Sequence, residues 1–231
     1  MKRHNNDHIL VFGDTHFPYH HPDTFEFLDA LLDLYPEIDR VVHMGDLLDQ
    51  YCFSSYPKVP NADVPNKEIE AARQCIRELA KRFPNLEIMA SNHDDRLYKK
   101  GTQAGIPKEI LLPYEQLIGS PRGWRWHKDL TLTVDSTREK VHFRHTTAEM
   151  TLNAARSLGC TTVLGHSHNR FGVQATKGPN KLIYGVDAGC LISDKGSPYA
   201  YNKGSVTRPV HGCVLLVRGV PYLMPMRSVL P

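Results

Sequence analysis

Over its first ninety residues the chain alternates short apolar runs with segments of helical spacing. The apolar runs cover residues 8–14, 40–46 and 86–94, and the helical patterns between them cover 24–35 and 66–83. A strand–helix–strand–helix–strand order predicts parallel pairing with right-handed crossovers. The chain is therefore expected to be an α/β protein.

The second half of the chain has a different pattern. Two apolar runs at 130–136 and 140–146, separated by a short polar turn, predict a hairpin or a pair of strands at a sheet edge. A short helix is expected at 150–159. The remaining apolar runs are expected to be strands, and they cover 160–168, 181–191, 212–219 and 221–226. We expect a mixed sheet, or two sheets packed face to face with helices outside, in one domain over 1–231.

The composition is that of an ordinary folded protein with a core, with 41% apolar and 23% charged residues. A net charge of +3 is too small to require a nucleic-acid partner by itself. Five cysteines without a CxxC pair are expected to be reduced thiols. No signal-peptide pattern is present, and no run approaches the roughly 20 apolar residues of a membrane helix. We therefore expect a cytoplasmic protein without membrane contact, whose oligomeric state is open.

Polar side chains able to bind metal stand at the ends of five apolar runs. In chain order they are Asp14, His16, Asp46, Asp49, Asn92, His93, His145, His166 and His168. Because parallel strands bring their carboxyl ends to one edge of a sheet, these side chains are expected to meet there. Asp14 and His16 are separated by one residue, and so are His166 and His168. The two side chains of each pair would therefore lie on the same side of an extended backbone.

Oxygen and imidazole ligands suit borderline divalent metals such as Mn, Fe and Zn. Without Asp49 and His93, seven of these side chains remain as ligands. Seven are too many for one tetrahedral zinc, and they fit two ions roughly 3.5–4 Å apart that share a bridging carboxylate. The Gly-Asp and Asn-His-Asp motifs alone are more often turns, since Asn and Asp favour turns, whereas for Gly-His-Ser-His alone the two interpretations are even, because two unpaired histidines are costly to bury. Turn chemistry does not account for five such motifs that each follow an apolar run.

The order of these motifs resembles that of the calcineurin-like metallophosphoesterase superfamily, in particular its small bacteriophage and bacterial members. The motifs are D-x-H at 14–16, G-D-x-x-D at 45–49, N-H-D at 92–94, His145, and G-H-x-H at 165–168. Two positions depart from the family pattern. Ser91 replaces a glycine, which matters only if that position needs positive φ. Thr146 follows His145 where the family has glycine, and His142 is a rival for the same role.

The resemblance implies a four-layer α/β/β/α sandwich of mixed sheets with two divalent ions at the sheet edge. Mn is the first choice, with Fe, Zn, Ni and Mg as alternatives. By motif, one ion would be bound by Asp14, His16 and His168, the other by Asn92, His145 and His166, with Asp46 bridging. A hydroxide between the ions would attack phosphorus in line. His93 would stabilise the developing charge or protonate the leaving oxygen, and Asp49 would orient His93.

The sequence says less about the substrate. Serine/threonine phosphatases of this superfamily have an Arg directly after the second motif, and here Gln50 stands there. Arg96 and Arg170 are candidates to hold phosphate, with surface salt bridges as the alternative. Tyr51 is a candidate to contact the substrate.

Two segments interleave aromatic and basic residues, 51–58 and 120–128, and this composition could stack bases. Core aromatics with solvated arginines are the alternative. Residues 50–66 and 195–209 are expected to be long surface loops, which often carry recognition.

The favoured function is a phosphodiesterase or nuclease acting on nucleotides or single-stranded nucleic acid, in the host cytoplasm if phage-encoded. The alternatives are a phosphomonoesterase acting on nucleotides, sugars or proteins, and a non-catalytic metal-binding scaffold.

Overall fold

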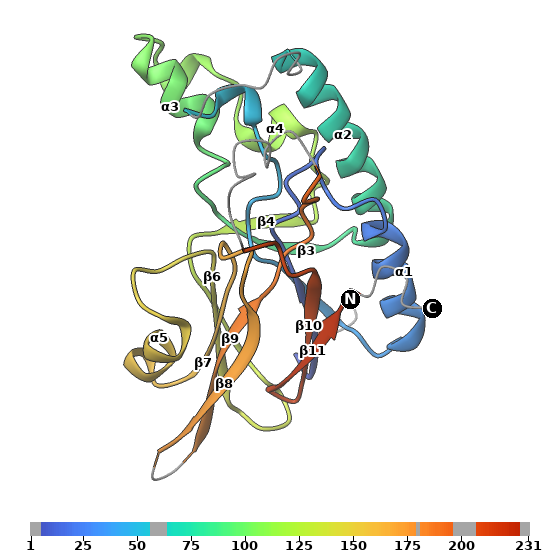
Figure 1. The fold of residues 1–231 in the computed structure, drawn as a ribbon, viewed down its shortest axis with the longest axis vertical. Helices are drawn as coiled ribbons and strands as arrows, with labels where there is room; N and C mark the ends of the chain where they lie inside the picture. The colour runs from blue at the N-terminus through green and yellow to red at the C-terminus, as the bar shows by residue number, and fades with distance from the viewer. Residues whose placement is uncertain (1–5, 56–63, 179–180, 196–206, 227–231) are drawn as a thin grey trace.

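A computed structural model describes residues 6–55, 64–178, 181–195 and 207–226 (Figure 1). Two sheets lie in the middle, with helices α1 (Thr24–Leu34) and α2 (Pro65–Arg82) along one side and α5 (Thr151–Leu158) on the other (Figure 1). The expected four-layer sandwich of mixed sheets is confirmed. No described helix is both long enough and apolar enough to cross a bilayer.

The first sheet has the strand order β11-β10-β1-β2-β3-β4. Its four parallel strands are β1 (His8–Phe12), β2 (Arg40–His43), β3 (Leu86–Met89) and β4 (Trp124–His127). Strand β10 (Gly212–Val217) runs antiparallel to β1, and β11 (Val220–Pro225) extends the sheet beyond it. The predicted parallel order of the first three strands is confirmed, with α1 and α2 as the crossovers.

The second sheet has the order β5-β6-β7-β9-β8. Strands β6, β7 and β9 are parallel, while β5 and β8 run antiparallel at the edges, so the predicted pairing of the first two runs is confirmed. The five strands are β5 (Leu130–Thr133), β6 (Lys140–Arg144), β7 (Thr161–Leu164), β8 (Phe171–Lys177) and β9 (Leu182–Ala188).

Four short helical elements and two strands were not predicted. The helical elements are η1 (Tyr51–Phe53), α3 (Arg96–Gln103), η2 (Lys108–Ile110) and α4 (Tyr114–Ile118). Strands β4 and β8 are the others. Residues 56–63 of the first expected loop, with Tyr56 and Lys58, lie outside the described residues, and so do residues 196–206 of the second.

Side-chain alternation along β1 builds two cores at once. Leu10 and Phe12 face α1 and α2, whereas Ile9 and Val11 face the second sheet, and all four are fully buried. Successive strand residues point to opposite faces, so a strand between two layers must be apolar on both. This explains why the strand patterns of the first half are continuous apolar runs.

The aromatic and basic segment 120–128 belongs largely to the core. It contains β4, where Trp124 is buried and its Nε1–H donates to the carbonyl of Phe83 at 2.8 Å. Trp126 is only partly buried and packs against the same core. For Trp124 the base-stacking interpretation is therefore wrong, because a strand of the sheet turns its ring toward the helices.

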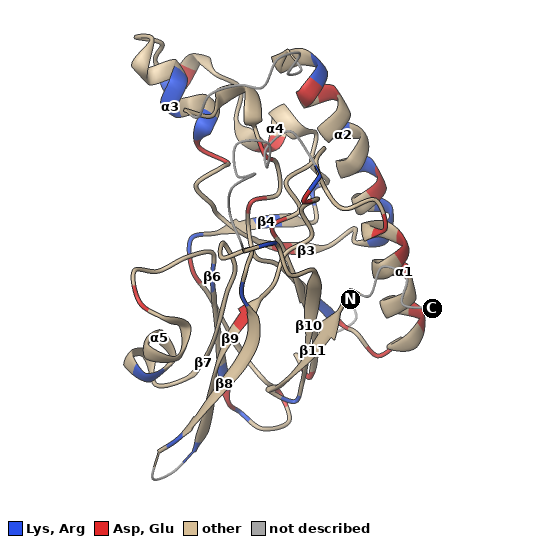
Figure 2. Cartoon of the chain, in the orientation of Figure 1, with Lys and Arg blue, Asp and Glu red and all other residues tan. Residues whose placement is uncertain are grey.

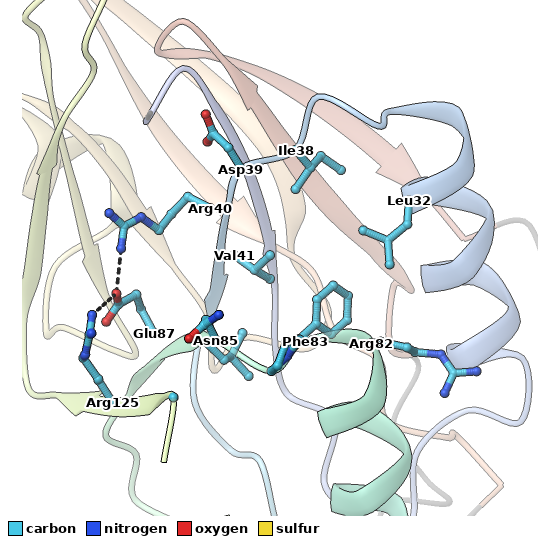
Figure 3. Close-up of a pocket in the computed structure, with 13 residues that line it drawn as sticks. Leu32, Ile38, Asp39, Arg40, Val41, Arg82, Phe83, Asn85, Glu87 and Arg125 are labelled. Atoms are coloured by element: carbon cyan, nitrogen blue, oxygen red, sulfur yellow. Dashed lines mark hydrogen bonds and ion pairs between the residues drawn. The ribbon is translucent and has the colours of Figure 1, made fainter. Parts of the chain in front are cut away.

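The amino ends of the parallel strands hold a compact charge cluster around Glu87 on β3. Figure 3 shows Arg40 and Arg125 converging on its carboxylate, at 2.8 and 3.4 Å, and His127 Nε2 lies 2.6 Å from the other oxygen. The pocket drawn there is at the opposite edge of the sheet from the predicted metal ligands. Because Glu87 is only 7% exposed, its partners decide whether its charge is tolerated.

Replacing Glu87 with Gln removes the charge that Arg40 and His127 share. We expect Glu87→Gln to lower the free energy of unfolding by about 2 kcal/mol, since hydrogen bonds to charged groups are the strong ones. Urea denaturation followed by circular dichroism measures this. Glu139→Gln is the matched control, because Glu139 is exposed. Equal stability of the two variants would show that the cluster contributes nothing.

Candidate metal centre

The candidate centre lies where the carboxyl ends of strands from both sheets meet. Asp14 and His16 follow β1, Asp46 and Asp49 follow β2, and Asn92 and His93 follow β3. The second sheet contributes His145 after β6 and His166 and His168 after β7. Parallel strands deliver the residues that follow them to one edge, and the face-to-face packing of the two sheets places both edges together.

Ligand atoms of these residues form two groups that share Asp46. Within each group the atoms lie within 4.8 Å of one another; the first contains Asp14, His16, Asp46 and His168, and the second Asp46, His145 and His166. Asn92 Oδ1 lies 3.1 Å from His145 Nε2 and so joins the second group. A third group contains His16, Asp49 and His93. The structure thus brings together all seven predicted metal ligands.

The unsatisfied polar atoms of the centre fit a cation. Asp46 is 1% exposed, and its Oδ2 has no hydrogen-bond partner among the residues that the structure describes. His16 Nε2 lies 3.0 Å from His168 Nε2 and 3.6 Å from Asp46 Oδ2. A buried carboxylate oxygen without a partner is costly, and two facing imidazole nitrogens can share only one proton. A divalent cation would satisfy all three atoms.

Several of these side chains are directed into the centre by residues with a strained, left-handed backbone conformation. The residue φ is 50° at Asp14 and His16, 48° at Asp46 and 66° at His166. A left-handed backbone is unfavourable for residues with a Cβ, and such strain collects at functional sites. The expectation that Asp14 and His16 share one side of an extended strand is therefore wrong. They meet because the chain turns sharply after β1.

Glycines of two motifs allow the loops of the two sheets to touch. A Cβ on Gly45, which has φ of +97°, would lie 2.7 Å from His145 Nδ1. A Cβ on Gly165 would lie 2.7 Å from Asp14 Oδ2. Ser91, the departure from the family pattern, is not among the residues with positive φ, so its side chain is accommodated without strain.

Hydrogen bonds behind the centre orient two of the histidines. His16 Nδ1 lies 2.8 Å from Asp49 Oδ2, and His145 Nδ1 donates to the carbonyl of Met44 at 2.7 Å. Each bond leaves Nε2 directed into the centre, as is usual for metal-binding histidines. His142, the rival of His145, instead contacts Thr131 and Asp129 on the outer side of β6.

Burial and the shared carboxylate set the protonation of the centre. Burial lowers the pKa of His16 to about 3, so its imidazole is neutral at pH 7. Burial also lowers the pKa of His145, but the Asp46 carboxylate outweighs it and raises that pKa to about 9. For Asp46, burial would raise the pKa, and His93 and His145 nevertheless hold it well below its usual value. Asp46, which belongs to both ligand groups, thus carries a negative charge.

Asp49 does not orient His93 in the expected way. His93 Nδ1 donates to the backbone carbonyl of Asp49 at 2.8 Å and stays 3.8 Å from its Oδ2. The carboxylate is instead engaged by His16 and by Arg96 NH1, at 2.8 and 3.3 Å. One residue therefore positions two histidines, one through its side chain and one through its backbone.

The three predicted substrate-binding residues lie in different surroundings. Arg96 is in the centre, with NH2 2.8 Å from His93 Nε2 and NH1 donating to the Asp49 carbonyl at 2.8 Å. Arg170 is exposed, two residues after His168. Tyr51 is only 2% exposed, and its ring packs edge-on against Tyr19. Tyr51 therefore lies in the core of the protein, and its assignment to the substrate stays a prediction.

The sequence analysis missed the residue that holds Tyr51 in place. The Glu68 carboxylate on α2 accepts hydrogen bonds from the backbone N–H groups of Tyr51 and Cys52, at 2.6 and 2.8 Å. This contact fixes η1 to α2, just after Asp49. A glutamate in the first turn of a helix is too common to have signalled that role.

Comparison with known proteins agrees with this geometry. The family model described as calcineurin-like phosphoesterase matches residues 8–181. None of the curated proteins matches the chain.

Two solved structures are similar in fold. One is an archaeal phosphodiesterase, 12% identical, covering 95% of this chain and 99% of the other with a TM-score of 0.47. The other is Vps29 from Chaetomium thermophilum, 14% identical, covering 90% and 82% with a TM-score of 0.41. At these identities and TM-scores, nothing about the function of this chain follows from either likeness.

His142 lies within β6 and His145 directly follows it, so the two histidines give a matched test of the centre. We expect His145→Ala to lose Mn²⁺ from the second group of ligands, because Nε2 of His145 faces Asp46 and Asn92. His142→Ala should bind Mn²⁺ as the unchanged protein does. Isothermal titration calorimetry with Mn²⁺ and metal-stripped protein measures the binding by both variants. Equal binding by the two variants would contradict the assignment of His145.

Proposed function

The chain belongs to the calcineurin-like phosphoesterase family, and from that membership we propose that it is a phosphodiesterase with two divalent metal ions, acting on nucleotides or single-stranded nucleic acid. The family makes it a metal-dependent phosphoester hydrolase. The observation that carries the proposal of two ions is the pair of ligand groups sharing Asp46. We propose Asp14, His16, Asp46 and His168 for one ion, and Asp46, Asn92, His145 and His166 for the other.

Bound divalent cations supply the positive charge that phosphate oxygens need and lower the pKa of water. The chain's own residues do the rest. Asp46 contributes a buried negative charge between the two groups, and Asp49 holds His16 in the orientation that frees Nε2. Since Asp49 and the Met44 carbonyl hold His16 and His145 by hydrogen bonds, these ligands are oriented before substrate arrives.

We assign His93 to the leaving oxygen of the substrate. In this structure its Nδ1–H donates to the Asp49 carbonyl, so Nε2 is the acceptor of the Arg96 N–H. To donate from Nε2, His93 must gain a proton there and part from Arg96. The guanidinium released in that way can pair with a phosphate oxygen. Arg96 thus links the position of His93 to the presence of substrate.

The distribution of positive charge favours a diester. Among the described residues, Arg96 is the one arginine or lysine that contacts His93 and Asp49. Its guanidinium already donates hydrogen bonds to both residues. Further cations, Lys99 and Lys100, lie along α3, where Figure 2 shows basic segments. A monoester brings about two charges to the centre itself. A diester brings one negative charge. In a longer nucleic-acid strand the further phosphates would lie outside the metal centre.

Arg170 favours a second candidate function, a phosphomonoesterase. Its exposed side chain follows the metal-ligand motif at the rim, where it could balance the extra charge of a terminal phosphate. The two candidates differ in the substrate that they accept.

Hydrolysis of two nitrophenyl substrates separates the candidates. We expect metal-stripped protein to hydrolyse bis(4-nitrophenyl) phosphate when Mn²⁺ is added back, and 4-nitrophenyl phosphate at a lower kcat/KM. Zn²⁺, Ni²⁺ and Mg²⁺ are compared in the same assay, followed by release of nitrophenolate. Turnover of the monoester alone would assign the phosphomonoesterase, and no turnover with any ion would contradict both.

Variants separate the two proposed roles within the centre. We expect His93→Ala to lose about 10²–10⁴-fold in kcat, the usual contribution of a general acid, and to keep its metal. Asp46→Asn should lose both activity and metal, because the shared ligand is weakened. Metal content by mass spectrometry accompanies the kinetics. Full activity of His93→Ala would remove His93 from the mechanism.

A further inference from the structure

A pocket of about 470 Å³ opens beside the loop that carries Asn92 and His93. Ala90, Ser91, Asp94 and Asp95 of that loop line one side of it. Elements α3, η2, α4 and the end of β4 form the rest. The volume is in the range of small-molecule binding sites, and far more than one water molecule occupies.

Three aromatic side chains form the walls of this pocket, which we call the ring pocket: Tyr98, Tyr114 and Trp126. The rings of Tyr114 and Trp126 meet edge to face, with centroids 6.0 Å apart and planes at 85°. Lys108 Nζ lies 5.1 Å from the centroid of the Tyr98 ring. Aromatic walls of this kind take planar rings, and every nucleobase has such a face.

The charges at the ring pocket exclude phosphate from it. Asp95, Glu109 and Glu115 are exposed acids in its lining, against the single cation Lys108 in that lining. Like charges repel an anion there, so the phosphate of a nucleotide would remain outside. Carboxylates instead accept hydrogen bonds from amino groups, as they do from N4 of cytosine. The lining thus suits an uncharged ring with an exocyclic amino group.

Two side chains in the lining have polar atoms that the protein leaves unsatisfied. Ser91 Oγ and Trp126 Nε1 are buried, and neither has a hydrogen-bond partner among the residues that the structure describes. An unpaired buried polar atom is unfavourable, so a partner supplied by a ligand would be favoured. The edge of a base carries both donors and acceptors, which match a hydroxyl and an indole N–H.

Hydrogen bonds tie the ring pocket to the metal centre. Asp94 Oδ2 accepts from the Ser91 backbone N–H at 3.0 Å, and Asp94 Oδ1 accepts from the Tyr114 hydroxyl at 2.7 Å. These bonds fix the loop whose intervening residues, Asn92 and His93, belong to the centre. The ring pocket and the centre therefore share one short loop as a common wall.

We propose that the ring pocket binds the base of the substrate nucleotide while its phosphate occupies the metal centre, with preference for bases that carry an exocyclic amino group. This inference rests on the phosphodiesterase function proposed above, and it names the part of the substrate that decides specificity.

Three diesters with the same leaving group test the inference. They are the 4-nitrophenyl phosphodiesters of cytidine (5′), of uridine (5′) and of methanol. We expect the KM of the cytidine ester to be about ten-fold lower than that of the methyl ester, from stacking of the base, at similar kcat. The uridine ester, which lacks the amino group, should lie between them. Equal KM values for the three esters would overturn the inference and leave the phosphodiesterase intact.

Variants locate the effect in the ring pocket. Trp126→Leu removes a wall, Glu115→Gln removes an exposed acceptor charge, and Ala90→Leu fills the pocket from its rim. Each should raise the KM of the cytidine ester toward that of the methyl ester and leave the methyl ester unchanged. Tyr222→Leu and Glu149→Gln are controls, since both residues are exposed elsewhere. A cytidine KM unchanged in folded Glu115→Gln and Ala90→Leu would overturn the assignment even if Trp126→Leu does not fold.

A binding measurement keeps the inference separate from turnover. Cytidine 5′-monophosphate should quench tryptophan fluorescence of the unchanged protein, and Ala90→Leu should weaken this binding. If no ester is hydrolysed with any metal, the proposed function fails while the quench still reports on the ring pocket. If no quenching is seen, or if Ala90→Leu is quenched as strongly as the unchanged protein, the proposal that the ring pocket binds the base is overturned.

Discussion

Asp46 carries a negative charge that the protein buries completely and does not fully satisfy. Its Oδ1 faces His145 from the second sheet, at 3.4 Å, and its Oδ2 lies 3.6 Å from His16 of the first sheet and has no hydrogen bond. Burying such a group is costly unless something compensates for it. The compensation here comes from histidines delivered by two different sheets. The two sheets must therefore pack accurately for this buried carboxylate to be tolerated, and the same packing assembles the candidate metal centre.

That packing depends on small residues and on strained turns at the strand ends. Gly45 and Gly165 leave no room for a Cβ where the loops of the two sheets meet. Asp14, His16 and Asp46 adopt left-handed backbone that β-strand residues avoid. The apolar packing between the sheets, with Met44 and Phe143 fully buried, supplies the stabilisation that such strain needs. Stability is thus concentrated in the layers, and strain in the loops that present the chemistry.

Much of this could be predicted from the chain alone. The parallel order of the first three strands followed from continuous apolar runs separated by helical patterns, since a strand between two layers is apolar on both faces. The candidate metal ligands followed from the residue types at strand ends. Strand β4 was missed because the aromatic and basic residues of its segment, among them Trp124, Arg125 and Trp126, were interpreted by their composition as a surface that could stack bases. The burial of Tyr51 could not be predicted, because its contacts with Glu68 and Tyr19 join residues that are distant in sequence.

The sequence by itself determined the α/β class, the set of candidate metal ligands and the family, because these depend on local patterns and on residue chemistry. Only the tertiary structure decided which atoms face one another. It showed that Asp49 holds His93 through its backbone and His16 through its carboxylate, and that Arg96 already occupies His93 Nε2. It also placed three aromatic rings from separate elements around one pocket. Contacts of this kind join residues far apart in the chain, so they exist only once the layers have packed.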